Sequence, residues 1–171
     1  MKHDPLTVFT AWEGPLGTMT LAATKRGLSG VWFDGQRHGP DTTAWRTDPA
    51  HPVLREAILQ LGQYFAGQRM SFDLPLDLHA GTPFQQQVWH ALLGIAPGAT
   101  TSYGSLSAAI GRPAAVRALG AAVGRNPVSI VVPCHRVLGA NGSLTGYAGG
   151  LERKTALLSL ECAALPSVPV H

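Results

Sequence analysis

The sequence has few cysteines, few charged residues and no long apolar run. Only Cys134 and Cys162 occur among its 171 residues, too few for a disulfide framework or a zinc site built from cysteines. The seven histidines do not recur at metal-ligand spacing, so we predict no metal and no other cofactor. No segment approaches the roughly 18 apolar residues of a membrane span, and the residues after Met1 carry no secretion signal. We therefore expect a cytoplasmic protein without a membrane partner.

Acidic residues are missing from most of the second half of the chain. The sequence holds 13 Lys and Arg against 10 Asp and Glu, yet no acidic residue occurs between Thr82 and Leu151. A polyanion could approach this segment without meeting a fixed negative charge. A segment whose only fixed charges are four arginines could equally be a neutral packing unit, so charge alone does not decide between the two.

The first part of the chain, residues 1–80, predicts a small α+β unit. Turn residues separate three short apolar runs, which is typical of an antiparallel meander. These runs are Leu6–Trp12, Met19–Thr24 and Leu28–Phe33. Apolar residues then recur at helical spacing from Val53 to Phe65, and the run Ser71–Leu78 predicts a further strand.

The second part, residues 81–165, begins with three predicted helices. Thr82 and Gln85 form a capping-box pattern that starts a helix ending near Ile95. Thr101 or Ser102 can cap a second helix through residue 110, and Pro113 starts a third over residues 114–123. Two short helices around a glycine-containing turn outline a helix-turn-helix, a motif that also arises by chance in proteins that do not bind DNA.

The third helix has an almost bare outer face. A helical wheel places three apolar residues together towards the core; they are Val116, Leu119 and Val123. Small residues flanked by Arg117 lie opposite; they are Ala114, Ala118 and Ala121. Such a face suits close approach to a DNA backbone or entry into the minor groove. It suits tight packing against another helix equally well.

A thiol stands beside an imidazole after a predicted buried strand. The strand is Val128–Val132, and Cys134 and His135 follow it directly. Successive strand side chains point to opposite faces, so the two groups need a turn or a bridging water to exchange a proton. Asn141-Gly142 predicts a hairpin turn, and the last helix, Leu151–Glu161, can return its final carboxylate to the imidazole. Without that carboxylate, a cysteine here is more often a small buried hydrophobe.

The stretch from Pro133 to Val137 resembles the active-site signature of the O6-alkylguanine-DNA alkyltransferases. The resemblance extends over residues 81–161 and rests on several motifs; they are Phe84-Gln85-Gln86-Gln87-Val88-Trp89, Ser102-Tyr103-Gly104, Asn126-Pro127, Pro133-Cys134-His135-Arg136-Val137 and Thr145-Gly146-Tyr147-Ala148-Gly149-Gly150-Leu151. It implies an α+β protein with a ribonuclease-H-like domain over residues 1–80. A winged helix-turn-helix-like alkyltransferase domain over 81–165 and a tail over 166–171 would follow. No cysteine cluster precedes the first domain, so the resemblance is to the short, freestanding bacterial type.

The resemblance also implies a reaction and its residues. An alkyl group would pass from O6-alkylguanine, with O4-alkylthymine as a second candidate, to Cys134 in one irreversible turnover after base flipping. The implied catalytic set is Cys134, His135, Glu161, Tyr103 and Asn126. The implied DNA-binding residues are Arg117, Tyr103, Ala115, Ala118 and Gly120. The implied base-pocket residues are Val137, Tyr147, Ala148 and Ser129.

We expect the partner to be double-stranded DNA containing alkylated guanine, bound through its minor groove by a monomer. Two hypotheses from other classes remain open on the sequence. A non-catalytic winged-helix DNA-binding module would not need Cys134, whereas a thiol hydrolase would use Cys134 and His135 with turnover. A hydrolase also needs an oxyanion site, for which the sequence has no signature.

Overall fold

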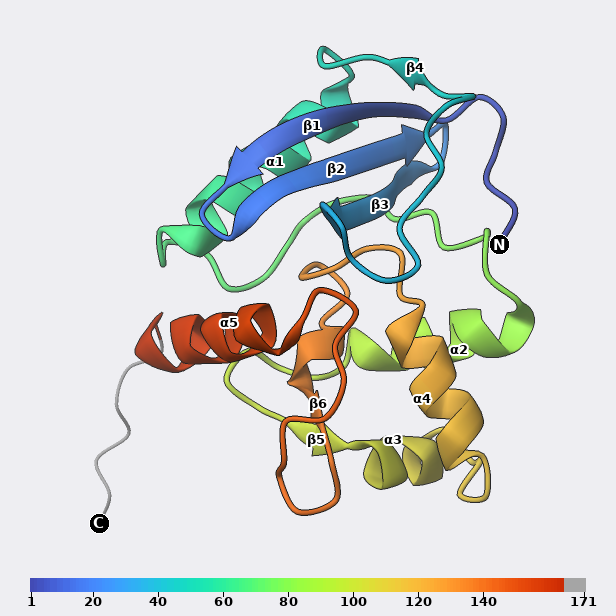
Figure 1. Cartoon of the computed structure of the whole chain (residues 1–171), viewed down its shortest axis with the longest axis vertical. Coiled ribbons are helices and arrows are strands. Elements are labelled where there is room, and N and C mark those ends of the chain that lie inside the picture. Colours follow the sequence, from blue (N-terminus) through green and yellow to red (C-terminus); the bar gives the residue numbers. More distant parts are fainter. Residues whose placement is uncertain (165–171) are drawn as a thin grey trace.

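The computed structural model describes residues 1–164, which form two parts stacked along the long axis of the molecule (Figure 1). In these residues the first part holds a sheet and one helix, and the second holds four helices and a pair of short strands. The α+β class is as predicted. The tail predicted at residues 166–171 lies outside the described residues.

The elements of both parts are labelled in Figure 1. The strands are β1 (Val8–Gly14), β2 (Gly17–Thr24), β3 (Gly27–Phe33), β4 (Arg46–Thr47), β5 (Thr101–Ser102) and β6 (Val137–Leu138). The helices are α1 (Pro52–Phe65), α2 (Pro83–Leu92), α3 (Tyr103–Ala109), α4 (Val116–Gly124) and α5 (Leu151–Ala164). A 3-10 turn, Cys134–Arg136, precedes β6.

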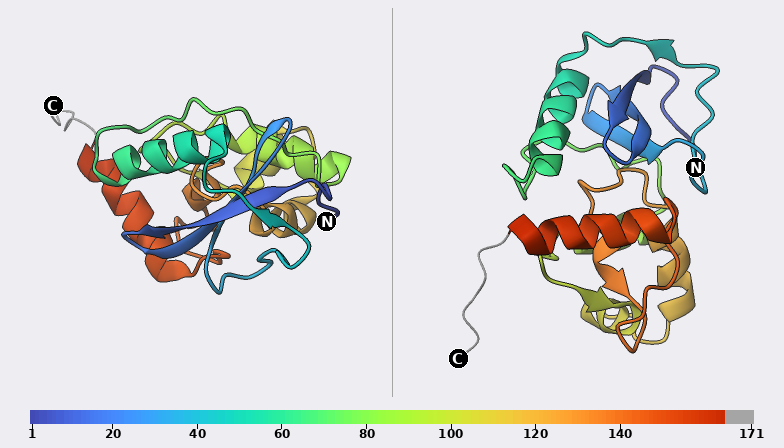
Figure 2. Two further views of the ribbon diagram at one scale, coloured as in Figure 1. Left: turned by 90° about the horizontal axis from the view of Figure 1, so that it is seen from above. Right: turned by 60° about the vertical axis from the view of Figure 1, so that its left-hand side comes forward.

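The first three strands form the predicted antiparallel meander. The sheet order is β3-β2-β1-β4, and the β1–β2 hairpin closes between Gly14 and Gly17. Gly17 has a φ of 115°, a conformation that residues with a Cβ rarely adopt, which explains the glycine at this turn. The short β4, which no pattern predicted, pairs in parallel with β1. Helix α1 packs on this sheet (Figure 2).

The strand predicted over Ser71–Leu78 is wrong, because the segment makes a single bridge, between Leu76 and Leu28 of β3. The Leu28 N–H donates to the Pro75 carbonyl at 2.7 Å, and the Asp77 N–H donates to the Leu28 carbonyl at 2.8 Å. Pro75 has no N–H with which to extend the ladder. The apolar side chains of this segment pack on the core without forming a strand.

The strand predicted over Val128–Val132 is also wrong. The Val132 N–H donates to the Val128 carbonyl at 2.9 Å and closes a tight turn, in which Ile130 has a φ of 73°. Asn126 holds both ends of this turn: its Nδ2 donates to the Val132 carbonyl at 2.8 Å, and its Oδ1 accepts the Val128 N–H at 3.0 Å. The β-branched residues that suggested a strand are buried in the core, so their pattern indicated burial and not extension.

The same turn is joined to the sheet of the first part. Val31 of β3 donates its N–H to the Pro127 carbonyl at 2.8 Å and accepts the N–H of Ser129 at 3.0 Å. Main chain from the second part thereby covers an edge of β3 that would otherwise expose unpaired groups. The segment that leads to Cys134 is therefore positioned by both parts of the molecule.

The predicted starts of α2 and α3 are confirmed. Thr82 and Gln85 form the reciprocal capping box of α2, and the Ser102 side chain accepts the Ser105 N–H at 3.0 Å at the start of α3. The turn at Asn141-Gly142 also forms. The hairpin predicted around it does not, because β6 pairs in parallel with β5 and no return strand follows in the described residues.

Helix α4 begins at Val116, later than the predicted start at Pro113. Its cap, Ala115, has no side-chain oxygen to accept the first N–H groups of the helix. Leu119 and Val123 are buried as predicted, but Val116 is 38% exposed. Val116 shares their side of the helix by spacing, yet it is the first residue of the helix and keeps more than a third of its surface exposed. The predicted core position at Val116 is therefore wrong.

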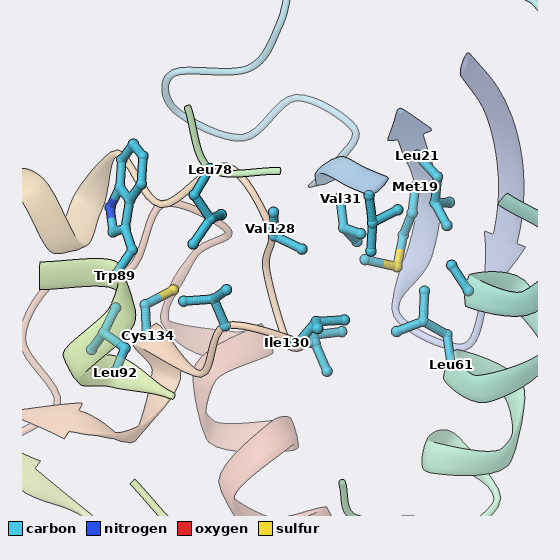
Figure 3. Close-up of a cluster of buried hydrophobic side chains, with 14 of the residues drawn as sticks. Met19, Leu21, Val31, Leu61, Leu78, Trp89, Leu92, Val128, Ile130 and Cys134 are labelled. Carbon is cyan, nitrogen blue, oxygen red and sulfur yellow. The ribbon is translucent and has the colours of Figure 1, made fainter. Parts of the chain in front are cut away.

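One hydrophobic core runs through both parts (Figure 3). Met19 and Leu61 enter it from the first part, Trp89 enters it from α2, and Ile130 lies between these groups. Trp89 is fully buried, and its Nε1–H donates to the Ala122 carbonyl of α4 at 2.8 Å. This contact fixes α4 on α2 by a directed bond in addition to apolar packing.

Replacing Trp89 with Phe should lower the free energy of unfolding by about 1–3 kcal/mol, because the Ala122 carbonyl loses a donor and the core loses ring volume. Urea unfolding followed by circular dichroism measures this difference. Leu59→Ala, at an exposed position of α1, is the control and should change stability by less than about 0.5 kcal/mol. An unchanged unfolding midpoint for Trp89→Phe would contradict the role given to this bond.

Candidate active site

The carboxylate of Glu161, near the end of α5, gathers donors from three other side chains. Its Oε1 is 2.7 Å from His135 Nε2 and accepts Arg136 Nη2–H at 2.8 Å and the Tyr64 hydroxyl at 2.9 Å. Its Oε2 accepts Arg136 Nε–H at 3.0 Å. Glu161 is fully buried. The predicted return of this residue to the imidazole is therefore present in the structure.

The protonation states of this cluster follow from its contacts. Burial by itself would raise the pKa of Glu161, but the hydrogen bonds from His135 and Arg136 outweigh it and lower that pKa to about 2. Burial lowers the pKa of His135, against the opposing effect of Glu161, so the ring is neutral near pH 7. Because an ionised carboxylate can only accept, His135 Nε2 carries the ring proton. The lone pair then lies on Nδ1, which has no hydrogen-bond partner among the described residues.

Cys134 lies on the 3-10 turn directly before His135 and is 5% exposed. The predicted obstacle of opposite strand faces does not arise, because the backbone is helical at these two residues. Burial raises the pKa of the Cys134 thiol, while the Asn126 amide and the charge of Lys154 act to lower it. The net shift is upward, so the resting group is a thiol and not a thiolate.

A cavity of about 130 Å³ opens over Cys134. Its size is close to that of engineered cavities of about 150 Å³ that hold one aromatic ring. The lining residues come from both parts of the chain; they are Arg37, His38, Tyr103, Gly120, Val123, Gly124, Cys134, Gly146, Tyr147 and Ala148. Cys134 is one of these lining residues, so a flat ring that entered the cavity would lie close to it.

The structure brings some of the proposed site residues to this cavity and leaves others elsewhere. The cavity is lined by five of them; these are Tyr103, Gly120, Cys134, Tyr147 and Ala148. Ser129 and Val137 are buried but do not line it. Arg117 and Ala118 are exposed on α4, with Ala115 half-buried at its cap. Asn126 acts on the turn before Cys134 and not on the cavity itself.

Several residues of the site were not predicted. Arg37 and His38 line the cavity from the loop after β3, and the Arg37 N–H donates to the Ala148 carbonyl at 3.0 Å. Tyr64 reaches Glu161 from α1 across 97 positions of sequence. The Tyr64-Phe65 pair was visible in the sequence only as part of an apolar helix face. A tyrosine on such a face was the one available signal, since a buried hydroxyl needs a partner.

Cys162 follows Glu161 near the end of the last helix, and from the sequence a small buried hydrophobe is the favoured role for it. This prediction is wrong, because the residue is exposed on α5. Its neighbour Glu161 faces the core, and consecutive helix positions differ by about 100° in direction, so Cys162 turns to the surface. Of the two cysteines, Cys134 is therefore the buried one.

Among residues 1–164, none of the helices has the length and the apolar character that a membrane span requires.

The fold and the site define a class of protein: a two-part α+β chain in which a buried cysteine lines a ring-sized cavity and an imidazole–carboxylate pair follows that cysteine. Two family models match this chain. Residues 8–78 match the ribonuclease-like domain of 6-O-methylguanine DNA methyltransferase. Residues 83–163 match the DNA binding domain of the same family. The chain belongs to the 6-O-methylguanine DNA methyltransferase family.

Similar proteins agree with this assignment. The methylated-DNA–protein-cysteine methyltransferase of Mycobacterium tuberculosis is 48% identical over 155 residues, which cover 91% of this chain and 92% of the relative. The protein of the same name from Methanosarcina acetivorans is 46% identical and covers 90% of this chain and 97% of its own length. A crystal structure of Mycobacterium tuberculosis OGT in complex with DNA matches with a TM-score of 0.85 and 46% identity, covering 94% of this chain and 96% of that chain.

The low pKa of Glu161 predicts a loss of stability in acid. Its pKa is about 2 in the fold, against 4.5 as the ordinary value, so the stabilisation is complete above about pH 5 and is lost as the pH falls towards 2. By linkage this difference corresponds to about 3 kcal/mol. Urea midpoints should therefore change little between pH 7 and pH 5 on account of this group and should fall between pH 5 and pH 3. Glu161→Gln should be less stable at pH 7 and should lose most of this slope, and an equal slope in both proteins would refute the assignment.

Proposed function

We propose that this protein repairs DNA by transferring the alkyl group of O6-alkylguanine to its own Cys134, once per molecule. The observation that carries the proposal is that Cys134 lines a ring-sized cavity and is followed in the chain by a neutral imidazole that Glu161 holds in place. The curated relatives share this activity by name over nearly the whole chain. Because its substrate is DNA and its thiol must stay reduced, we place the protein in the cytoplasm.

The chemistry is a single displacement. The Cys134 proton passes to Nδ1 of His135, directly or through one water, and the resulting thiolate attacks the alkyl carbon. The S–C bond forms as the C–O6 bond breaks, and the electron pair of that bond goes to guanine. Guanine takes up a proton from the Tyr103 hydroxyl, which lines the same cavity. The thioether has no second nucleophile to release it, so the molecule is spent after one reaction.

The outer face of α4 is the proposed contact with DNA. Arg117 and Ala118 are exposed there, and this half of the chain carries no acidic side chain between Thr82 and Leu151. A face of small residues lets the helix backbone approach the minor groove closely. Arg117 would fill the space in the base stack that the flipped nucleotide leaves. One chain holds the whole site, so we propose that a monomer is the active form.

Cys134→Ser should abolish alkyl transfer and leave duplex binding nearly unchanged, because a serine hydroxyl is far less ionised than a thiol in the same place. Intact-protein mass measured before and after mixing with a methylated oligonucleotide reads out the transfer. The wild-type protein should gain one methyl group per molecule, and Cys162→Ser should behave like the wild type. Recovery of the methyl group on Cys162, or repeated turnover, would count against the proposal. Turnover would favour a hydrolase.

Arg117→Ala should slow repair of duplex DNA about a hundredfold while sparing reaction with free O6-benzylguanine, because only the duplex has a stack to fill. Single-turnover rates on the two substrates give the comparison. Arg55→Ala, an exposed arginine on α1, is the matched control for loss of charge and should change neither rate. Equal losses on both substrates would mean that Arg117 supports the cavity or the fold instead.

A further inference from the structure

Lys154 is a fully buried lysine on the first turn of α5. Its Nζ donates to three carbonyl oxygens: Val137 at 2.6 Å, and Thr145 and Gly146 each at 3.2 Å. These contacts use all three donors of the ammonium group. Within the described part of the chain no carboxylate forms an ion pair with it. A buried cation without a counter-charge is costly, so its presence calls for a reason beyond filling space.

The three carbonyls lie on both sides of the loop that forms one wall of the cavity. Val137 belongs to β6, directly after the turn that carries Cys134, and Gly146 itself lines the cavity. Lys154 thus ties the start of the cavity wall to the strand that follows the reactive cysteine. The neighbouring Tyr147 and Ala148 continue the same wall.

The Thr145 carbonyl has a second donor, the hydroxyl of Tyr103, at 3.2 Å. The same Tyr103 lines the cavity beside Cys134. A carbonyl oxygen has two lone pairs, so it can accept from Lys154 and Tyr103 together. In the proposed reaction the Tyr103 hydroxyl must leave this carbonyl in order to give its proton to guanine.

We propose that Lys154 is a positioning residue for Tyr103: it keeps the Thr145 carbonyl hydrogen-bonded and the cavity wall in place when the hydroxyl turns to the base. The proposal rests on the proposed function, in which Tyr103 protonates the departing guanine. With Lys154 present, the Tyr103 hydroxyl leaves a carbonyl that keeps one strong donor. Without Lys154, the turn of the Tyr103 hydroxyl towards the base would leave the Thr145 carbonyl without a protein donor. This cost should slow transfer about ten- to a hundredfold.

A double-mutant cycle tests this coupling. Lys154→Met, Tyr103→Phe and the double variant are prepared in a Cys162→Ser background, which leaves Cys134 as the thiol to be followed. Single-turnover transfer from free O6-benzylguanine is measured for each. Lys154→Met should lose about tenfold or more, and the double variant should be no slower than Tyr103→Phe alone. Independent, multiplicative losses would overturn the proposal, because they would show that Lys154 does not act through Tyr103.

Reaction of Cys134 with iodoacetamide separates an effect on Tyr103 from an effect on the thiol. This reagent needs the thiolate but no proton for its leaving group. Loss of the Lys154 charge removes one influence that lowers the pKa of Cys134, so Lys154→Met should slow this reaction, but much less than it slows transfer from O6-benzylguanine. A loss equal to that seen with O6-benzylguanine would assign Lys154 to thiolate stabilisation and overturn the proposal. Lys25→Met, at an exposed lysine, controls for the loss of one positive charge.

A second variant covers the risk that Lys154→Met does not fold. Lys154→Gln keeps N–H donors without the charge. Because these donors can still reach a carbonyl of the loop, the Gln variant should retain more alkyl transfer than the Met variant. Melting curves of all variants accompany the rates, and a Gln variant that is folded but as slow as the Met variant contradicts the proposal. If the wild-type protein itself gains no alkyl group by mass, the proposed function fails. If the wild type reacts and the cycle is multiplicative, only the Lys154 inference fails.

Discussion

The buried carboxylate of Glu161 is the contact on which the arrangement of the site depends. A buried charge is costly unless a counter-charge or hydrogen bonds compensate it, and for Glu161 the guanidinium of Arg136 supplies the opposite charge through two nitrogens. The same carboxylate fixes the ring of His135 and with it the position of the lone pair on Nδ1. A neutral glutamic acid could not do this, because its own proton would compete for the ring nitrogen. The hydrogen bonds that lower its pKa are therefore also the ones that select the useful tautomer.

The first part of the chain takes part in the site, although the reactive groups lie in the second. The Tyr64 hydroxyl donates to Glu161, and main chain of β3 at Val31 pairs with the residues on both sides of Val128. Arg153 of α5 lies 4.6 Å over the Phe33 ring and donates to the Leu16 carbonyl. These contacts act at separate points: the carboxylate, the turn before Cys134 and the start of α5. Weaker contacts between the two parts would therefore disturb both the His135–Glu161 pair and the cavity.

The sequence alone predicts an element correctly where the residues at its end hydrogen-bond to one another. The capping box at Thr82 and the cap at Ser102 were predicted because each motif satisfies its own N–H groups within four residues. The turn over Val128–Val132 could not be predicted from its composition, since it is held by the Asn126 side chain and by pairing with β3. Exposure of Val116 depends likewise on which elements reach the first turn of α4.

The site shows the same difference between residues that a local motif reveals and residues whose partners are distant in the sequence. The sequence placed Cys134 next to His135 and indicated that Glu161 could return to them, because all three lie in one motif and the helix after it. No motif in the sequence links Tyr64 or Lys154 to the site. The pattern around Tyr64 indicates only an apolar helix face, and nothing in the sequence of the last helix indicates that the charge of Lys154 is buried. Their roles arise from main-chain and side-chain partners that are distant in sequence. Such partners become visible only in the folded molecule.

Burial of Cys134 suits a protein that each reaction consumes. A thiolate exposed to solvent would react with small electrophiles and oxidants, and each such reaction would inactivate one protein molecule. In the fold, burial raises the pKa of this thiol, so the resting group is protonated and of low reactivity. The base that would remove its proton, His135 Nδ1, is neutral and held in place. Reactivity then depends on a substrate that brings its alkyl carbon to the sulfur inside the cavity, and the low reactivity of the resting thiol becomes a source of selectivity.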